Sequence, residues 1–585
     1  MADRLRSSPR ADQAQQIEWQ PWGPEAFDRA ARSEKPILLS LTAVWCQWCR
    51  RMDETTYSDP RIIRLINDEL VPVRVDADRY PHVQDRYIAG GWPTNAFLTP
   101  TGEVLWSGTY IPPDQFWAVA NGVLSAWRER REALQSEIER RRKALEAARS
   151  QRPALGLVRR EAADDVLSAT QDAFDPRNGG FGTEPKFPHG EAVELLFVQG
   201  LRMPNPDWVE MAERTLDGMR AGELWDEIDG GFFRYAMAAD WTAPRHEKLL
   251  SVNADLLRAY ALGAHLSRRG DWGEIAERTV EWAERVLRRP DGLWGGSQNA
   301  DEDYYRLDED DRRRRQPPAV DPVLYTNWNA QWIQALAEAG GRLGREDWIA
   351  RAAGALERLL ETMAAPNDLL YHFQAPGERP DLPGLLIDSV AAASACVAVG
   401  QATGRREFID HARRLVAGME RAFWAEGGGF YDHVRSEHDV GALRYRDRPF
   451  DLNASAARLL LDLSLATGER SYRAMAERTL ALLSPLAGRY GVSGAVFALA
   501  VEEFFEPPLQ IVVVGPPEEA APLRLAALRL GEPDRRVWSL EAGGRLGALE
   551  FPAKAGVAAY VCGPRACSPP IRDPAALQPA VDALR

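Results

Sequence analysis

The stretch KPILLSLTAVWCQWCRRM, residues 35–52, decides the fold of the first part of the chain. Its apolar run Pro36–Thr42 predicts a buried strand, and a helix is expected to begin at the cysteines. Cys46 would then lie at a helix N-terminus, where the helix dipole and free amide groups favour the thiolate. Cys49 follows one helical turn later and is placed to resolve a mixed disulfide. This spacing predicts a redox-active pair.

The alternative for a CxxC sequence is half of a zinc site. No second CxxC and no His pair lies at a suitable spacing, so we expect redox or redox-derived chemistry, no metal and no cofactor. Of the other cysteines, Cys396 lies in an apolar run and is expected in the core. Cys562 and Cys567 are close enough for a local disulfide or for exchange with another thiol, but a structural role at a buried strand end is favoured.

The sequence after this pair continues the same α/β pattern. A second strand is predicted at 71–75, and GGWPTNAFLTPTGEVL, residues 90–105, predicts a hairpin around Thr101-Gly102. In a redox fold of this kind Pro93 would be cis and would abut the cysteine pair. We therefore expect Cys46, Cys49 and Pro93 as catalytic residues, with the aromatic neighbours Trp45, Trp48 and Trp92 contacting the substrate.

A highly charged segment follows this first domain. WRERREALQSEIERRRKALEAARS, residues 127–150, combines good helix formers with alternating charges and predicts a long solvated helix. Glu interleaves with Arg throughout, which argues against nucleic-acid binding. The predicted domains are an α/β domain at 1–125, a helical linker at 126–158, a helical domain at 159–505 and a small α/β subdomain at 506–585.

The region 159–505 repeats a helical hairpin. Paired segments with 3.6-residue apolar periodicity recur every fifty to seventy residues, and Gly-rich aromatic turns accompany them at 179, 230, 295 and 427. We count eleven or twelve helices, close to six hairpins. Repeats that cannot bury their apolar faces alone must stack or close on their neighbours, so this pattern predicts an all-α (α/α)6 toroid with inner and outer rings.

A toroid has a central cavity, and residues near the turns are candidates to line it. The chain has only five lysines, which makes Lys248 conspicuous, and it is expected to be held charged by Glu247. Lys248→Met should then abolish ligand binding while changing stability by no more than about 1 to 2 kcal/mol. For each candidate a core or capping role is the more common alternative. The candidates are Asp226, Arg234, Tyr235, Trp241, His246, Glu247, Lys248, Asp301, Trp328, Asn329, Asp388, Tyr431 and Asp432, and of these Asp226, Trp241, His246, Glu247, Lys248, Asp301 and Asp388 are the predicted binding residues.

Two further segments complete the chain. RLDEDDRRRRQPP, residues 306–318, is expected to be an exposed loop inserted between hairpins. The apolar run LQIVVVG, residues 509–515, begins an alternation of strands and a helix that predicts a small α/β appendage with a partly parallel sheet. The appendage lacks GxGxxG, so a dinucleotide site is not expected.

Several of these strings resemble one family. The runs 17–27 (IEWQPWGPEAF), 35–40 (KPILLS), 46–49 (CQWC) and 90–93 (GGWP) are similar to the thioredoxin-like domain of the DUF255 family, the group of spermatogenesis-associated protein 20. The similarity continues at 179–182, 185–188, 230–235, 247–250 and 561–570. The resemblance implies a thioredoxin-like domain followed by a toroid like that of six-hairpin glycosidases and sugar epimerases, with thiol–disulfide activity.

The departures from the family pattern bear on activity. Gln47 replaces a His between the cysteines, and Ser40 stands where thioredoxins carry a buried Asp, so slower thiol exchange is expected. In the toroid, Val252 and Asn299 replace carboxylates, and Arg245 stands where the family has His, with His246 in the next position. Loss of these carboxylates weakens a paired-acid glycosidase mechanism.

Composition limits the remaining possibilities. The 585 residues carry a net charge of −14, which opposes attraction to nucleic-acid phosphates, and no apolar stretch approaches the ~20 residues of a membrane helix. The first residues lack the apolar core of a secretory signal, so a cytoplasmic protein is expected. The predicted function is a thiol–disulfide oxidoreductase acting on a protein or small-molecule disulfide, without nucleic-acid or membrane partners. The alternative is a carbohydrate-binding or carbohydrate-modifying toroid with a structural or regulatory thioredoxin-like domain.

Overall fold

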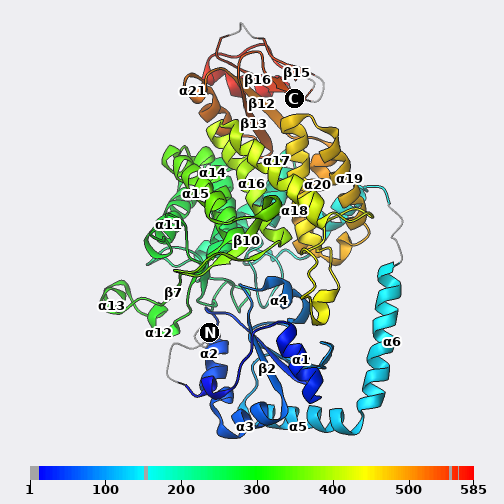
Figure 1. The fold of residues 1–585 in the computed structure, drawn as a ribbon. Helices are drawn as coiled ribbons and strands as arrows, with labels where there is room; N and C mark the ends of the chain where they lie inside the picture. Colours follow the sequence, from blue (N-terminus) through cyan, green and yellow to red (C-terminus); the bar gives the residue numbers. More distant parts are fainter. Residues whose placement is uncertain (1–11, 151–155, 548, 553–555, 564–565, 585) are drawn as a thin grey trace. The chain divides into compact units, whose positions relative to one another are not determined.

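The computed structural model describes residues 12–150, 156–547, 549–552, 556–563 and 566–584 (Figure 1). The chain divides into two compact units. The first extends to Ala154 and also includes Asn299–Asp301 and His433–Asp447, and the second comprises the rest. Each unit is described by itself below.

The first unit is built on a four-stranded sheet in the order β2-β1-β3-β4. Strand β1 pairs in parallel with β2 and antiparallel with β3, and β3 forms a hairpin with β4. The predicted strands and the hairpin at Thr101-Gly102 are therefore confirmed. The strands are β1 (Ile37–Thr42), β2 (Val71–Asp76), β3 (Thr94–Leu98) and β4 (Val104–Gly108).

Helices cover both faces of this sheet, which explains why β1 is apolar throughout. Alternate residues of β1 enter two different cores, Leu39 on one face and Leu38 on the other. The first face packs against residues of α1 and α4, and the second against residues of α2, α3 and α5. The helices are α1 (Pro24–Ser33), α2 (Gln47–Glu54), α3 (Pro60–Glu69), α4 (Pro81–Tyr87) and α5 (Pro113–Glu129).

A segment distant in sequence completes this unit. Residues 433–447, which sequence reasoning assigned to the toroid, contribute Val440 and Leu443 to the core that holds Leu39. The Ala442 amide donates to the Tyr87 hydroxyl at 2.8 Å. A side chain on Gly102 would collide with the backbone of Gly441, so the β3–β4 turn requires glycine at this close approach.

The charged segment after this sheet is helical, but it is not one helix. Helix α5 packs Phe116 and Leu124 into the core, and a break at Arg130 precedes α6 (Arg131–Ser150). Ion pairs one turn apart, such as Arg141 with Glu137 at 2.8 Å, run along α6 as the charge pattern predicts. The predicted linker 126–158 also covers residues 151–155, which lie outside the described part.

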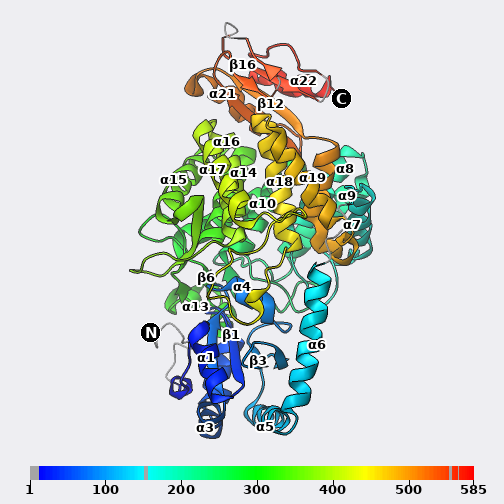
Figure 2. The same cartoon turned by 45° about the vertical axis from the view of Figure 1, so that its right-hand side comes forward.

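The second unit contains the predicted toroid of twelve helices, and its ring is closed within the described residues (Figures 1 and 2). Each inner helix contacts the next, and α20 contacts α8. The sixth hairpin is formed by the last inner helix and the first outer helix, since α20 packs against α7. The inner helices are α8 (Gly190–Arg202), α10 (Leu250–Leu266), α14 (Thr326–Leu343), α16 (Leu386–Thr403), α18 (Phe450–Thr467) and α20 (Ala495–Phe505), and the outer ones are α7 (Glu161–Asp172), α9 (Pro206–Ala221), α11 (Gly270–Val286), α15 (Glu346–Thr362), α17 (Arg406–Phe423) and α19 (Arg470–Leu483).

An asparagine on an inner helix fastens each of three glycine–aromatic turns. The Asn453 side chain accepts from the Phe430 amide at 2.6 Å and donates to the Phe430 carbonyl at 3.0 Å. Asn253 holds Phe232 in the same way, and Asn329 holds Trp294. Asn329, a candidate cavity residue, therefore has a structural role that satisfies buried backbone groups.

Helix α16 is long and apolar enough to cross a membrane by length and composition, and it is the one such helix among the described residues. Within the protein, 72% of its apolar window is buried. It packs between α14 and α18 as an inner helix of the ring, and this position accounts for its composition.

The C-terminal subdomain is part of the second unit and has the predicted partly parallel sheet. Strand β12 pairs in parallel with β13 and antiparallel with β16. Cys562 is buried at the end of β16 and forms a disulfide with Cys567. The expected buried strand end and the expected local disulfide are therefore both found. The elements are β12 (Leu509–Val514), α21 (Pro517–Leu528), β13 (Arg535–Leu540), β16 (Ala558–Cys562) and α22 (Leu577–Asp582).

Candidate functional site

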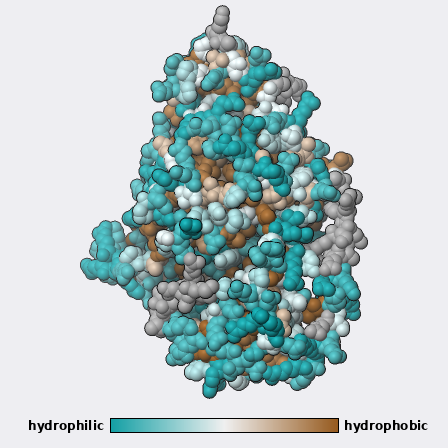
Figure 3. All heavy atoms as spheres, viewed as in Figure 1, coloured by the Kyte–Doolittle hydropathy of each residue, from teal (hydrophilic) through white to brown (hydrophobic). Residues whose placement is uncertain are grey.

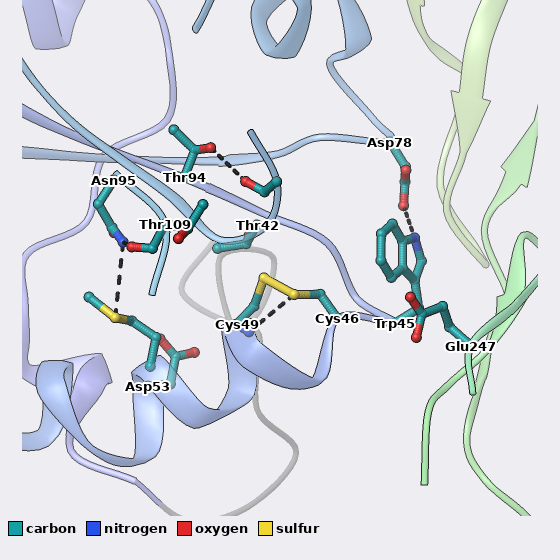
Figure 4. Close-up of a disulfide and its surroundings, with 12 residues drawn as sticks. Thr42, Trp45, Cys46, Cys49, Asp53, Asp78, Thr94, Asn95, Thr109 and Glu247 are labelled. Atoms are coloured by element: carbon teal, nitrogen blue, oxygen red, sulfur yellow. Dashed lines mark hydrogen bonds between the residues drawn. A yellow bond between two sulfur atoms is a disulfide. The ribbon is translucent and has the colours of Figure 1, made fainter. Parts of the chain in front are cut away.

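The cysteine pair begins helix α2 and forms a disulfide (Figure 4). Cys46 is the N-cap residue, and its sulfur accepts a hydrogen bond from the Cys49 amide at 3.1 Å. This free amide and the helix dipole would stabilise negative charge on the Cys46 sulfur after reduction. Cys46 is 4% exposed and Cys49 is 1% exposed, so the first cysteine is the more accessible one.

The Trp92–Pro93 peptide bond is cis, as expected for a redox fold of this kind. Thr94 holds the turn beside it, because its hydroxyl donates to the Gly91 carbonyl at 2.7 Å and accepts from the Ala89 amide at 3.1 Å. A second cis bond, Glu184–Pro185, lies in the other unit and was not anticipated from the sequence.

The three tryptophans beside the pair differ in availability. Trp45 is buried and donates to the Asp78 carboxylate at 2.7 Å (Figure 4). Its ring meets that of Trp92 edge-to-face, with the ring centroids 5.3 Å apart. Trp48 is 42% exposed and packs one side against Tyr110. Trp92 is half-buried, so Trp48 is the most exposed of the three predicted aromatic contacts.

A row of polar residues crosses the sheet on one face. Ser40 of β1 is fully buried and lies in register between Arg74 of β2 and Asn95 of β3. Arg74 forms a buried ion pair at 2.6 Å with Asp53, which lies one turn beyond Cys49 on α2. Ser40 thus stands where thioredoxins carry an acid, and the buried carboxylate beside this row, Asp53, comes from α2 instead.

The predicted partnership of Glu247 with Lys248 is not found. Glu247 and Lys248 stand at the start of β5 (Lys248–Leu249), where successive side chains point to opposite sides. Glu247 instead forms an ion pair with Arg234 at 2.6 Å. Lys248 is fully buried and donates to Asp226 at 2.6 Å and to the Gly230 carbonyl at 2.7 Å. Burial opposes ionisation of Asp226, but Lys248 and Arg312 together outweigh it and lower the pKa of this carboxyl.

The charged insertion is anchored at the same carboxylate. The predicted exposed loop contains the short helix α13 (Glu309–Arg314), which lies in the hydrophilic protrusion at the left of Figure 3. Arg312 points inward, is 6% exposed and contacts Asp226 at 2.8 Å and Asp229 at 2.9 Å. Its neighbour Arg313 stays largely exposed. Arg312 is buried by neighbouring residues whereas Arg313 is not, and the charge pattern of the sequence does not reveal this difference.

The other predicted binding residues of the toroid are held in structural contacts. Trp241 is fully buried and donates to the Asn178 carbonyl at 3.1 Å. His246 stacks on Tyr305 with ring centroids 5.4 Å apart. Asp388 is buried against His372 at 3.0 Å, and burial raises the pKa of its carboxyl. Asp301 belongs by its contacts to the first unit, outside the toroid to which sequence reasoning assigned it.

A cavity of about 270 Å³ lies along the axis of the toroid, and sequence reasoning did not identify its lining. All six inner helices contribute to it, together with residues of β13 from the C-terminal subdomain. Its charged residues come from the inner helices and from β13, and none of them lies in the glycine-rich turns. They are Glu191, Glu194, Asp255, Arg258, Glu338, Arg342, Arg458, Asp462, Arg535 and Arg536. Charged positions on the mostly apolar faces of inner helices were the available signal.

The fold and the cysteine pair define a protein that joins a thioredoxin-like unit with a CxxC disulfide to an (α/α)6 toroid carrying a small α/β subdomain. Residues 6–146 match the family described as "Protein of unknown function, DUF255", which confirms the resemblance drawn from the sequence for this part of the chain.

Similar proteins span parts of this arrangement. An uncharacterized protein of Caenorhabditis elegans is 33% identical over 291 residues, which cover 46% of this chain and 38% of the relative. Human spermatogenesis-associated protein 20 is 30% identical over 310 residues, covering 49% of this chain and 39% of the relative. The matches thus span less than half the length of these relatives. Thioredoxin-1 of Drosophila melanogaster is 31% identical over 68 residues, covering 12% of this chain and 61% of the relative.

Among solved structures, a sugar epimerase from a ruminal bacterium is similar with a TM-score of 0.46 and 14% identity. The similarity covers 55% of this chain and 84% of the epimerase. At this level of similarity nothing follows about activity.

Proposed function

We propose that this chain is a thiol–disulfide oxidoreductase that uses Cys46 as nucleophile. The observation that carries the proposal is the position of Cys46 at the N-cap of α2, with its sulfur accepting the Cys49 amide. This arrangement lowers the free energy of a thiolate relative to a thiol. The exposed Trp48 offers an adjacent apolar surface for a disulfide-bearing protein or small molecule.

The reaction would proceed by two exchanges. The Cys46 thiolate attacks one sulfur of the substrate disulfide, forms a mixed disulfide and releases the other substrate sulfur as thiolate. The Cys49 thiolate then attacks the Cys46 sulfur, closes the Cys46–Cys49 disulfide and releases the second substrate thiolate. The two thiolates take up two protons from solvent, and an external dithiol reductant restores the pair for the next turnover.

Two residues set the expected rate. Ser40 supplies no carboxylate for proton transfer, and exposed Gln47 supplies no cation beside the nucleophile. Thiol exchange depends on the thiolate fraction, so turnover is expected to fall well below that of a general thioredoxin. The net charge of −14 also disfavours a nucleic-acid partner.

The carbohydrate alternative has less support from side chains. Trp241 and Asn329 are committed to the toroid core, and Lys248 is committed to an ion pair. Among the described lining residues of the axial cavity there is no aromatic ring on which a sugar could stack. We therefore place the proposed activity in the thioredoxin-like unit.

Alkylation and turnover test the proposal together. The reduced protein is treated with limiting iodoacetamide at neutral pH, and peptide mass spectrometry should find Cys46 modified first. Insulin reduction with dithiothreitol should be lost in Cys46→Ser. It should be retained in Cys396→Ala, because burial raises the pKa of the Cys396 thiol and keeps it unreactive.

A third variant separates the two disulfides of the chain. Replacing Cys562 and Cys567 together by Ala should leave insulin reduction unchanged. Preferential alkylation of Cys49, or turnover that survives in Cys46→Ser, would contradict the assignment.

A further inference from the structure

The axial cavity of the toroid contains more charge than its own ion pairs use. Three of its five carboxylates, Glu194, Glu338 and Asp462, form ion pairs with arginines that also line the cavity. Glu194 accepts from Arg458 at 2.6 Å on one oxygen and from Arg258 at 3.3 Å on the other. Glu338 accepts from Arg258 at 3.0 Å on one oxygen and from Gln334 at 2.8 Å on the other.

Two carboxylates in the cavity remain uncommitted. No described residue donates a hydrogen bond to the side chain of Glu191 or Asp255, although both line the cavity. They lie on neighbouring helices, and the backbone of α8 approaches Asp255 closely at Gly190. Burial raises the pKa of Asp255, and the like charge of Glu191 raises it further. A cation at this end of the cavity would relieve both effects.

Positive charge without a matching carboxylate lies further along the cavity axis. One terminal nitrogen of Arg342 is buried without a hydrogen-bond partner, and both oxygens of nearby Glu338 are already used. Arg535 of β13 adds a second positive charge that interacts with Arg342. Its guanidinium donates to backbone carbonyls, among them those of Ala527 at 3.0 Å and Glu532 at 2.6 Å. Burial lowers the pKa of Arg342, and the negative charges of Glu338 and Glu194 do not fully offset this effect.

Helix geometry sets the separation between these two ends. Helices α10 and α14 are both inner helices and run in the same direction, and the pair Arg258–Glu338 places these residues at a common level. Asp255 lies three residues before Arg258, and Arg342 lies four residues after Glu338. At 1.5 Å per residue, the seven residues correspond to about 10 Å along the axis. An extended chain of about three residues spans this distance.

The wall contributed by α16 is uncharged, and Ser394 and Gln401 are the polar residues in its otherwise apolar surface. Ile387, Val390 and Val397 line the cavity from this helix. A ligand that fits must therefore carry charge at its ends and present uncharged atoms between them.

We infer that the axial cavity binds a short zwitterionic, peptide-like molecule, with its ammonium group at Glu191 and Asp255 and its carboxylate at Arg342. This inference concerns a site separate from the cysteine pair and does not depend on the proposed redox activity. Each terminal group would replace a missing partner of a desolvated charge, which is where charge-assisted hydrogen bonds contribute most.

Calorimetric titration of the full chain with triglycine tests the inference. Triglycine has the required ends and length. N-acetyl-triglycine lacks the ammonium and triglycine amide lacks the carboxylate, so each is expected to bind about tenfold more weakly or worse. These comparisons use the unaltered protein and do not depend on whether a variant folds.

Variants then locate the two ends. Asp255→Asn should weaken binding of triglycine about tenfold and leave the affinity for N-acetyl-triglycine, which has no ammonium, unchanged. Arg342→Gln should likewise weaken triglycine about tenfold and leave the affinity for triglycine amide, which has no carboxylate, unchanged. Asp410→Asn on the outer helix α17 is the matched control and should bind like the unaltered chain. The inference is overturned if triglycine shows no saturable binding at millimolar concentration, if blocking either end has no effect, or if cellobiose binds and triglycine does not.

Discussion

Trp45 and Trp48 lie three residues apart around the cysteine pair, yet the fold uses them differently. Trp45 precedes α2, is buried and is fixed by its hydrogen bond to Asp78. Trp48 lies inside the first turn of α2, where the helix turns it toward solvent. A sequence with Trp on both sides of a nucleophile cannot distinguish a positioning role from a contact role, because this depends on which side meets the sheet.

Replacing the two tryptophans should separate these roles. Trp48→Ala is expected to raise KM for a protein disulfide and to change the free energy of unfolding by less than about 0.5 kcal/mol. Trp45→Ala should cost about 3 to 5 kcal/mol, because it opens a large void and removes one hydrogen bond to Asp78. Insulin reduction kinetics and urea unfolding measure both effects. An unchanged KM in Trp48→Ala would exclude it from the substrate surface.

The scarcity of lysine identified a special residue correctly, but its role is structural. Lys186 and Lys248 each bridge a turn aspartate and a backbone carbonyl in a fully buried position. A compact ammonium fits such a site, whereas the planar fork of arginine does not. The partner of Lys248 could not be predicted, because Asp226 lies 22 residues away while Glu247 is adjacent in sequence.

Lys248→Met is therefore expected to destabilise the protein by about 3 to 5 kcal/mol, since it leaves a buried carboxylate with reduced compensation. The sequence alone predicted a change of at most about 2 kcal/mol. Thermal or urea unfolding decides between these values, and Lys143→Met on the exposed face of α6 is the control. A Lys248→Met protein as stable as the control would restore a binding role for this residue.

At the scale of elements, apolar periodicity was sufficient to predict six hairpins, because each helix must bury one stripe whatever its neighbours are. The hydrogen bonds that hold the hairpin turns could not be predicted from this periodicity. The asparagine clamp, by which the Asn453 side chain bonds to the backbone of Phe430, joins residues 23 apart through polar atoms, which leave no periodic signal. Likewise, the insertion of 433–447 into the thioredoxin-like unit rests on the close approach of Gly441 to Gly102, far away in the chain.

The asparagine clamp can be tested in one hairpin. Asn453→Leu preserves approximate volume but leaves the buried amide and carbonyl of Phe430 without partners, so a loss of about 2 to 4 kcal/mol in unfolding free energy is expected. Asn205→Ala is a useful comparison, because this residue caps an exposed end of α9 and should cost about 1 kcal/mol. Equal losses in the two variants would mean that the clamp adds nothing beyond a surface cap.

At the scale of the second unit, one buried network joins the toroid to the C-terminal subdomain. Glu194 of α8 binds Arg458 of α18, which binds Glu503 of α20 at 2.8 Å. Glu503 in turn contacts Arg536 of β13 at 3.1 Å. Burial would raise the pKa of Glu194, but the arginines around it, chiefly Arg458 and Arg258, outweigh burial and lower the pKa to about 2.

This lowered pKa predicts how stability depends on pH. A carboxylate whose pKa is about 4.5 unfolded and about 2 folded contributes stability that is present above pH 4.5 and is lost as pH falls toward 2. The shift corresponds to about 3 kcal/mol. Glu194→Gln should therefore be less stable than the unaltered chain by about this amount at pH 7, and the difference should shrink steadily below about pH 5.

Urea unfolding of both proteins at neutral pH and near pH 3 measures the difference directly. Glu274→Gln, at an exposed position of the outer helix α11, is the control, because Glu274 has no ion pair among the described residues and its replacement should change stability by no more than about 0.5 kcal/mol at either pH. Lowering the pH protonates Glu194 in the unaltered chain, and this abolishes the charge difference between the unaltered chain and Glu194→Gln. The control variant retains Glu194, so its comparison with the unaltered chain is not affected in this way. A stability difference that stays the same size at both pH values would therefore show that Glu194 acts through packing and not through its charge.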